Sequence, residues 1–266
     1  MIQVEHIRKS FGGIQAVDDC SFDIPQGRIT GLIGPNGAGK TTLFGIIAGF
    51  MKPNSGRILL DGADVTGWPP HRLCRRGLVR TFQIPHVFDR MSVRENLMVV
   101  PAGQHGENLF AAWLSGARVA REDAAVGAQA EDVMGVLNLT ALADERAGNL
   151  SGGQKKLVEL GRTMMSGATT ILLDEPGAGV NRTLLATLTD DIARLNRDHG
   201  YTFCIIEHDM DVVAQLCDPV IVMAEGRVIA EGSFDAVRRD AGVIEAYLGG
   251  APVRQLNGGS QSEAAR

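Results

Sequence analysis

The chain has 266 residues, of which 44% are hydrophobic, so it can bury a sizeable core in one large α/β domain that carries a subdomain. Its formal net charge of −5 argues against a dominant nucleic-acid surface and against strong attraction to an anionic membrane. The sequence contains neither a run of about 18 apolar residues nor a basic start followed by an apolar stretch, so we expect no membrane span and no signal peptide.

The N-terminal segment predicts strands at residues 2–8 and 17–24, followed by an apolar strand at residues 29–33. Turn residues at 25–27 separate the second strand from the apolar one. Phe11 lies in the connection between the first two strands. The local sequence leaves two roles open for its ring, which are stacking on a nucleotide base and ordinary packing.

Residues 34–41 follow the apolar strand directly and match the phosphate-loop pattern G-x-x-x-x-G-K-[S/T]. Glycines let successive N–H groups point at one anion, Lys40 adds a positive charge, and a helix expected over residues 40–48 presents its N-terminus there. Thr41 is placed to ligate a Mg²⁺ ion that bridges the outer phosphates. A flexible glycine-rich turn is the alternative, and the strand–loop–helix order disfavours it. The predicted nucleotide-binding residues of this segment are Gly34, Pro35, Asn36, Gly37, Ala38, Gly39, Lys40, Thr41 and Thr42.

The next segment predicts a strand at residues 57–60, a hairpin turn at Asp61-Gly62 and a short helix from Pro69 toward Arg76. A short strand at residues 79–82 then ends at Gln83, on the edge where α/β folds bind ligands. A lone glutamine is nevertheless more often a surface or capping residue. The local cluster of basic residues is either a solvated helix face or a partner surface, and it consists of Arg72, Arg75, Arg76 and Arg80.

Residues 92–147 change to helix formers without a strand pattern, and we expect helices at 92–100, 109–119 and 123–137. The segment Leu150-Ser-Gly-Gly-Gln154 follows at the head of another helix, which reaches about Met165. Ser151 is a good N-cap, and the two glycines expose the first backbone N–H groups as a second anion-binding site. A simple capped helix is the alternative for this segment.

Two later strands end in polar side chains. The apolar strand that begins at residue 170 ends in Asp174 and Glu175, of which the first can hold Mg²⁺ through water and the second can orient or deprotonate a water. A capping or solvated acidic pair is the alternative. The strand at residues 202–206 delivers Glu207 and His208 to the same phosphate edge. A lone histidine is more often packed or exposed, but this position favours a functional one.

The C-terminal part predicts an amphipathic helix at residues 182–196, a helix capped by Asp209 and a hairpin around Glu225-Gly226. Two short helices end near Leu248. Residues 249–266 lack apolar periodicity, and we expect them to be disordered.

Together these motifs resemble the ATP-binding-cassette (ABC) ATPases, over residues 1 to about 248. The resemblance rests on the order and spacing of residues 34–41, Gln83, 150–154, 174–175 and His208. It implies an α/β fold with a RecA-like phosphate-loop core, an N-terminal antiparallel β subdomain and an inserted α-helical subdomain. The core with its β subdomain then covers residues 1–84 and 161–248, and residues 85–160 form the helical subdomain that carries the signature motif.

The resemblance also assigns roles to single residues. It implies that Phe11 stacks on the base, Glu175 is the catalytic carboxylate and His208 contacts the γ-phosphate. It also implies that Gln83 senses Mg²⁺ and water. Gln83 is therefore expected to be both a catalytic residue, with Glu175 and His208, and a metal-binding residue, with Thr41 and Asp174. The cofactors are ATP and Mg²⁺. The signature residues bind the ATP of the other subunit, and they are Leu150, Ser151, Gly152, Gly153 and Gln154.

A closer resemblance is to the ATPases of branched-chain amino acid uptake, through residues 81–83, 177–181, 206–210 and 243–249. Asn181 departs from the general pattern, where an aspartate commonly ends the loop after the catalytic glutamate. Uptake cassettes for urea or amides and the lipopolysaccharide-export ATPase share much of this architecture, so they stay as alternatives.

The implied function is an ATPase subunit that powers amino acid import from the inner, cytoplasmic face of the cell membrane. Its partners are a second ABC ATPase, identical or not, separate membrane permease subunits and, indirectly, a substrate-binding protein, with no nucleic acid. The alternatives are a module that uses ATP only to dimerise, a soluble cassette that acts on DNA or ribosomes, and a phosphate-loop kinase. The four cysteines lack metal-ligand spacing and predict reduced thiols, in keeping with a cytoplasmic protein.

Overall fold

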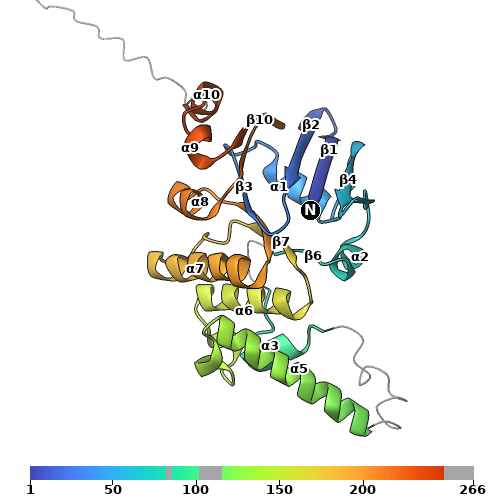
Figure 1. The fold of residues 1–266 in the computed structure, drawn as a ribbon, viewed down its shortest axis with the longest axis vertical. Coiled ribbons are helices and arrows are strands. Elements are labelled where there is room, and N and C mark those ends of the chain that lie inside the picture. The colour runs from blue at the N-terminus through green and yellow to red at the C-terminus, as the bar shows by residue number, and fades with distance from the viewer. Residues whose placement is uncertain (82–85, 102–115, 249–266) are drawn as a thin grey trace, which may run out of the picture.

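The computed structural model describes residues 1–81, 86–101 and 116–248 (Figure 1). Gln83, the loop at residues 103–106, most of the helix expected at 109–119 and the tail at 249–266 lie outside the described residues. Within the described ranges, no helix combines the length and the apolar character that a membrane crossing needs.

The core is a six-stranded sheet with the order β10-β9-β3-β8-β7-β6. The neighbours from β9 to β6 are parallel, and β10 pairs antiparallel with β9 at the edge. Every residue of β3, β7, β8 and β9 is buried, because helices and a second sheet cover the two faces. Burial on both faces explains why these strands are continuous apolar runs in the sequence. The strands are β3 (Ile29–Ile33), β6 (Leu78–Arg80), β7 (Thr170–Asp174), β8 (Thr202–Ile206), β9 (Val220–Ala224) and β10 (Arg227–Gly232).

A second, antiparallel sheet has the order β2-β1-β4-β5 and lies beside the core in Figure 1. Its strands are β1 (Ile2–Phe11), β2 (Ile14–Ile24), β4 (Ser55–Leu60) and β5 (Ala63–Asp64). Asp61 and Gly62 have φ values of 50° and 77°, which the predicted tight hairpin turn requires. The expected fold class, a RecA-like α/β core with an antiparallel β part and a helical part, is confirmed.

The helices pack on the core sheet and extend from one end of it (Figure 1). α3, α5 and α6 contact one another and make up the helical part, whereas α6 also contacts α7. The division at residue 160 stays a prediction, and that boundary falls within α6. The helices are α1 (Lys40–Ile47), α2 (Pro70–Arg75), α3 (Val93–Met98), α5 (Gly116–Val136), α6 (Gly152–Met165), α7 (Arg182–His199), α8 (Met210–Leu216), α9 (Phe234–Val237) and α10 (Ala241–Leu248).

Three sequence expectations need correction. α5 runs unbroken through residues 119–123, because those residues are helix formers and Arg118 bonds to Glu122 one turn on. Phe11 is the last residue of β1, where it pairs with Ile14, and does not lie in the connection. Arg80 belongs to β6 and has a buried ion pair, so it is not part of a solvated helix face.

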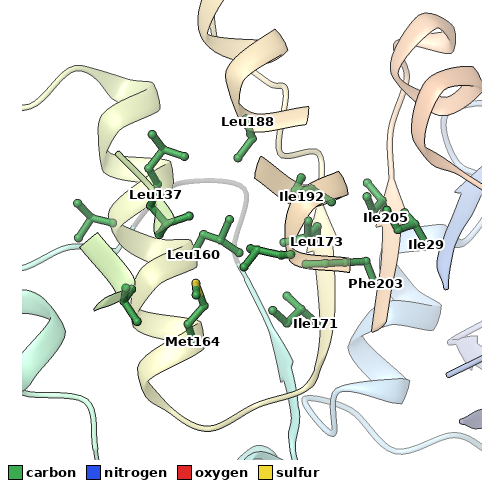
Figure 2. Packing of buried hydrophobic residues seen from close by; sticks show 14 of the residues in the cluster. Ile29, Leu137, Leu160, Met164, Ile171, Leu173, Leu188, Ile192, Phe203 and Ile205 are labelled. Carbon is green, nitrogen blue, oxygen red and sulfur yellow. The ribbon is translucent and has the colours of Figure 1, made fainter. Parts of the chain in front are cut away.

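Two hydrophobic clusters lie on opposite faces of the core sheet. Ile171 and Leu173 of β7 point into one cluster and Leu172 into the other, as the two-residue period of a strand dictates. Figure 2 shows Leu173 beside Leu160 of α6 and Ile192 of α7. α6 and α7 therefore share a packed core with the strand that ends in Asp174.

Candidate nucleotide-binding and catalytic site

The phosphate loop packs against backbone atoms of β2, of β9 and of the turn that joins β9 to β10. A Cβ atom on Gly34 would lie 2.0 Å from Met223 O, and one on Gly39 would lie 2.2 Å from Ala16 O. Both glycines also have left-handed φ values, 147° and 95°, that disfavour larger residues. The amide of Gly226 donates to Ala38 O at 3.1 Å. The shape of the loop is therefore fixed by backbone contacts to two other elements.

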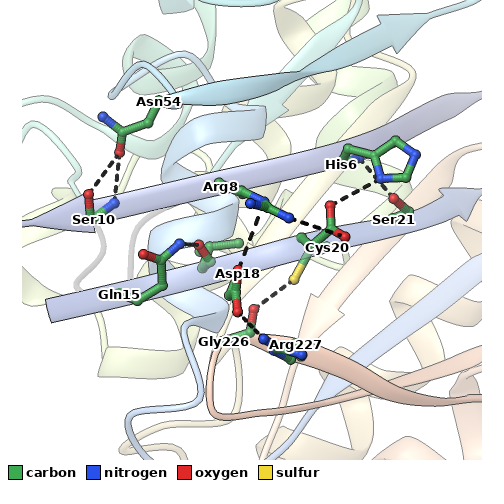
Figure 3. A network of polar contacts seen from close by, with 12 residues as sticks. His6, Arg8, Ser10, Gln15, Asp18, Cys20, Ser21, Asn54, Gly226 and Arg227 are labelled. Atoms are coloured by element: carbon green, nitrogen blue, oxygen red, sulfur yellow. Dashed lines mark hydrogen bonds and ion pairs between the residues drawn. The ribbon is translucent and has the colours of Figure 1, made fainter.

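A polar network attaches the antiparallel sheet to that same turn (Figure 3). Gly226 O accepts hydrogen bonds from the Asp18 amide at 2.7 Å and from the Cys20 thiol at 3.0 Å, and Arg227 pairs with Asp18. Burial raises the pKa of the Cys20 thiol to about 11, so it stays a neutral donor. The hairpin predicted around Glu225-Gly226 is thus the joint between the two sheets, next to the phosphate loop.

Polar groups from the loop and from two strand ends line one depression of about 260 Å³. Its lining residues are Ile14, Gln15, Ala16, Asn36, Gly37, Ala38, Gly39, Lys40, Thr41, Thr42, Glu175 and His208. Sequence-predicted residues separated by more than 160 positions therefore meet in one place. Phe11, whose side chain is half exposed, is outside this lining, as are Gly34, Pro35 and the signature residues.

Lys40 is buried at the base of the depression, and its Nζ donates to Gly34 O at 2.7 Å and to Pro35 O at 3.0 Å. Burial lowers the pKa of Lys40, whereas the negative charges of Glu175 and Asp174 raise it. Burial thus removes part of the hydration of the Lys40 ammonium group, and the nearby carboxylates favour its positive charge.

Glu175 and His208 form a direct pair across neighbouring strand ends. His208 Nε2 and Glu175 Oε1 are 2.9 Å apart, and the Glu175 amide donates to Ile206 O at 2.9 Å. Glu175 has a φ of 50°, an uncommon conformation for a residue other than glycine. The parallel pairing of β7 with β8 brings these two groups together.

Asp174 lies one residue earlier and is 6% exposed. Its Oδ2 is 2.6 Å from Nη2 of Arg80, in an ion pair whose side chains are 8% and 11% exposed. Among the described residues, no group of three or more His, Cys, Asp or Glu side chains could hold a metal ion. The hydroxyl of Thr41 and the carboxylate of Asp174 are hard oxygen donors of the kind Mg²⁺ prefers, so these two residues could contribute to holding that ion.

The signature segment begins α6 with a capping box. Ser151 Oγ accepts from the Gln154 amide at 3.4 Å, and Gln154 Oε1 accepts from the Ser151 amide at 2.9 Å. The two glycines have different surroundings, because a Cβ on Gly153 would lie 1.9 Å from Cδ2 of Leu184 whereas one on Gly152 would meet nothing within 4 Å. Gly153 allows α6 to pack closely on α7, and Gly152 leaves the helix terminus open.

A family model described as ABC transporter matches residues 17–178, which is more than half of the chain. The chain belongs to the ABC transporter family. A second model, Branched-chain amino acid ATP-binding cassette transporter, matches residues 227–252 of this cassette. The resemblance drawn from the sequence motifs is confirmed, and the cassette is an ATPase of the ABC type.

Curated relatives match the cassette over nearly its whole length. It is 40% identical to "Probable branched-chain amino acid transport ATP-binding protein LivG" of Archaeoglobus fulgidus, over 94% of this chain and 95% of the relative. It is 36% identical to "High-affinity branched-chain amino acid transport ATP-binding protein BraF" of Pseudomonas aeruginosa, over 94% and 98%. The closer resemblance to this group of cassettes is confirmed as well.

Solved structures match the fold equally well. A nucleotide-free ATP-binding cassette from an ABC transporter has a TM-score of 0.78 and 37% identity, covering 93% of this chain and 98% of that one. An ATP-binding cassette in its ADP conformation has a TM-score of 0.79 and 37% identity, covering 94% and 98%. These neighbours support nucleotide binding by this fold.

Two residues of the cassette, the buried Glu207 and the half-buried Lys156, had no distinct role in the sequence prediction. Glu207, which is 4% exposed, accepts from the Gly177 amide at 2.6 Å and from the His208 amide at 3.0 Å. Lys156, two residues after the signature segment, donates to carbonyl oxygens of the loop behind Glu175. The adjacency of Glu207 to His208 is a sequence signal for the first residue, whereas no local pattern indicates the second.

Proposed function

We propose that this cassette hydrolyses ATP to power branched-chain amino acid import through separate permease subunits. The observation that carries the proposal is the meeting of the phosphate loop with the Glu175–His208 pair in one depression. The substrate class follows from the relatives named above and from the family model over residues 227–252. Branched-chain amino acids would contact the permeases and not this chain.

The phosphate loop binds ATP through its phosphates. Its inward N–H groups and the N-terminus of α1 bind the phosphates, and Lys40 exchanges its bonds to Gly34 O and Pro35 O for phosphate oxygens. Thr41 and, through water, Asp174 would hold Mg²⁺, and the charge of this ion would offset that of the outer phosphates. Phe11, at the exposed end of β1, stacks on the base.

Glu175 is the general base of the proposed reaction. Its carboxylate orients the attacking water and accepts a proton from it, while His208 fixes the carboxylate and contacts the γ-phosphate. Gln83 senses Mg²⁺ and water from the segment that follows β6. Glu207 acts indirectly, because it bonds to the backbone on both sides of the pair.

The proposed assembly needs a second cassette, because the signature residues of this chain lie outside the depression that holds its own phosphate loop. Leu150 to Gln154 cover ATP on the partner, and Gly152 offers the open helix terminus. Residues 85–160 act as the helical subdomain against residues 1–84 and 161–248. Permeases dock at residues 84–90 and the helical segment behind them, and this docking would hold the cassette at the inner face of the membrane.

The test is substitution of the proposed base. Glu175→Gln is expected to lower the rate of phosphate release at least about a hundredfold, because the amide cannot accept the proton. Its affinity for ATP should stay within about twofold, since the loop that binds phosphate is unchanged. Glu245→Gln, on the exposed face of α10, is the matched control and should hydrolyse ATP normally. Undiminished turnover in Glu175→Gln would remove Glu175 from this role.

A further inference from the structure

The loop that follows Glu175 is fastened by a lysine of the signature helix. Nζ of Lys156 donates to the carbonyl oxygens of Pro176 at 2.6 Å, Ala178 at 2.7 Å and Glu175 at 3.4 Å. An ammonium group has three donors, so these three carbonyls can occupy all of them. This side chain is therefore committed to the backbone of a segment about 20 residues away in the sequence.

The same segment is held from its other side by Glu207, which accepts from the amide of Gly177 at 2.6 Å. The amide of Glu175 bonds to β8, whereas its carbonyl oxygen faces Lys156. The left-handed φ of Glu175, 50°, is disfavoured for this residue type and persists only where the surroundings fix it. Lys156 is one of the groups that fix it.

The charge of Lys156 is embedded among acidic groups. Burial lowers its pKa, while the charges of Glu207, Glu159 and Glu175 raise it. A cavity of about 20 Å³, with room for about one water molecule, lies beside it between Leu173 of β7 and Leu188 of α7. The bonds to the carbonyl oxygens of Glu175 and Pro176 are partly buried, and a hydrogen bond shielded from water is electrostatically stronger than an exposed one.

Lys156 also lies one helical turn after Gly152, the open glycine of the signature segment. The neighbouring Gly153 packs directly on Leu184 of α7, and Asn181, where the same loop ends, is the N-cap of α7. The first two turns of α6 thus contact the segment behind Glu175 through Lys156, and the first turn of α7 through Gly153. A displacement of the signature helix would be transmitted to that segment through a packed contact and three hydrogen bonds.

We propose that Lys156 is a positioning residue that couples the two nucleotide sites of a cassette dimer. It ties the helix that covers ATP in one site to the backbone of Glu175 in the other. The proposal rests on the proposed function, since it takes Glu175 as the base and residues 150–154 as the cover. Lys156 touches neither nucleotide nor water in this scheme and acts only through Glu175.

The test compares two adjacent lysines in the full chain. Lys156→Met removes the donors but keeps the length of the side chain, and should lower kcat about tenfold or more with KM for ATP within about twofold. The Hill coefficient for ATP should fall toward about 1, because coupling between the sites is lost.

Lys156→Arg keeps the positive charge and the hydrogen-bond donors and should recover most of kcat. Lys155→Met is the matched control, because Lys155 pairs only with Asp89 on the surface at 3.2 Å among the contacts the structure describes.

Three results would overturn the proposal. The first is a Lys156→Met protein with unchanged kcat and Hill coefficient. The second is a loss of kcat in Lys155→Met as large as that in Lys156→Met. The third is a loss of nucleotide affinity in Lys156→Met that parallels its loss of kcat, which would make Lys156 a general structural residue. Equilibrium binding of a fluorescent ATP analogue separates the last case. Glu175→Gln in the same assay separates failure of the coupling proposal from failure of the proposed function. If Glu175→Gln is inactive while Lys156→Met has normal activity, only the coupling proposal is rejected. If the parent chain hydrolyses no ATP, the proposed function is rejected.

Discussion

Lys40 bonds to two carbonyl oxygens of its own loop, Gly34 O and Pro35 O, at distances of 2.7 and 3.0 Å. Its ammonium group is thus already directed to the concave side of the loop. A phosphate that enters the depression offers a charged acceptor in place of two neutral ones, and charge-assisted hydrogen bonds are roughly twice as strong. We therefore expect Lys40 to contribute to the affinity for nucleotide and not only to the shape of the loop.

Lys40→Ala should weaken ATP binding by about 1.5–3 kcal/mol, which is roughly ten- to a hundredfold, because a charged hydrogen-bond donor is lost. Equilibrium binding of ATP to the purified chain measures this directly. Lys52→Ala, a substitution of an exposed lysine in the turn before β4, is the control and should bind as the parent does. Equal affinities for the Lys40→Ala and parent proteins would contradict the phosphate-loop assignment.

The residues missed by sequence reasoning share one property, which is that their partners lie far away along the chain. Arg80 pairs with Asp174, 94 positions later, and Glu207 binds the Gly177 amide, 30 positions earlier. The phosphate loop, by contrast, is a continuous segment whose glycines and lysine have fixed spacing. A local sequence pattern thus predicts a binding loop whose residues are contiguous. It does not predict contacts between side chains that the pairing of strands brings together.

The signature helix shows at the scale of an element why two adjacent glycines are not equivalent. Gly152 is open on its Cβ side, and Gly153 is buried against Leu184. The sequence predicted exposed N–H groups for both. Close packing of α6 on α7 was not predictable, because the relevant contact joins two helices separated by a strand and a loop.

Gly153→Ala should destabilise the cassette by about 1–2 kcal/mol, because its new methyl group forces Leu184 out of place. Gly152→Ala should leave stability unchanged or raise it slightly, since alanine favours a helix and meets open space. Chemical unfolding of the two variants beside the parent gives the comparison. Equal free energies of unfolding for both variants would show that the glycine at 153 does not serve packing.

The start of α7 explains the asparagine that departs from the general family pattern. Asn181 is the N-cap, and its Oδ1 accepts from the Leu184 amide at 2.9 Å. An aspartate at this position offers the same acceptor with a negative charge that the helix N-terminus favours. Asparagine and aspartate are therefore equivalent at this position for helix capping.

Asn181→Ala should lower the free energy of unfolding by about 1 kcal/mol through loss of the cap, whereas Asn181→Asp should retain stability. Thermal unfolding monitored by circular dichroism measures both. A destabilisation by aspartate as large as that by alanine would mean that the amide group has another partner in the folded protein.

Most elements were predictable because their signals are local. Apolar or β-rich runs predicted β3, β7 and β8, the hairpin around Glu225-Gly226 predicted β9, and Asp209 caps α8 as expected. The length of α5 was predicted less well, because helix-forming residues continue across the expected break. The pairing order of the strands depends on contacts between distant segments, so no local pattern predicted it.

The whole molecule brings the carboxyl ends of parallel strands to one edge, which is where the phosphate loop, Glu175 and His208 meet. The signature segment is placed elsewhere, at the head of α6. In the proposed assembly, one chain carries both parts of a nucleotide site, and a second cassette is needed to bring them together. Two copies of this chain related head to tail would complete two such sites, and a homologous cassette could take the place of the second copy.

Sedimentation of the Glu175→Gln protein with ATP tests this account most directly, because we expect that variant to bind ATP without hydrolysing it. We predict that ATP doubles its mass and that ADP does not, since ADP lacks the γ-phosphate that would contact both subunits in the proposed dimer. Adding Gly152→Glu should abolish the dimer yet leave ATP affinity intact, because the new carboxylate has room in the monomer but repels the partner's nucleotide. A Glu175→Gln protein that stays monomeric at saturating ATP, or a Gly152→Glu variant that still dimerises, would contradict a site shared between two chains.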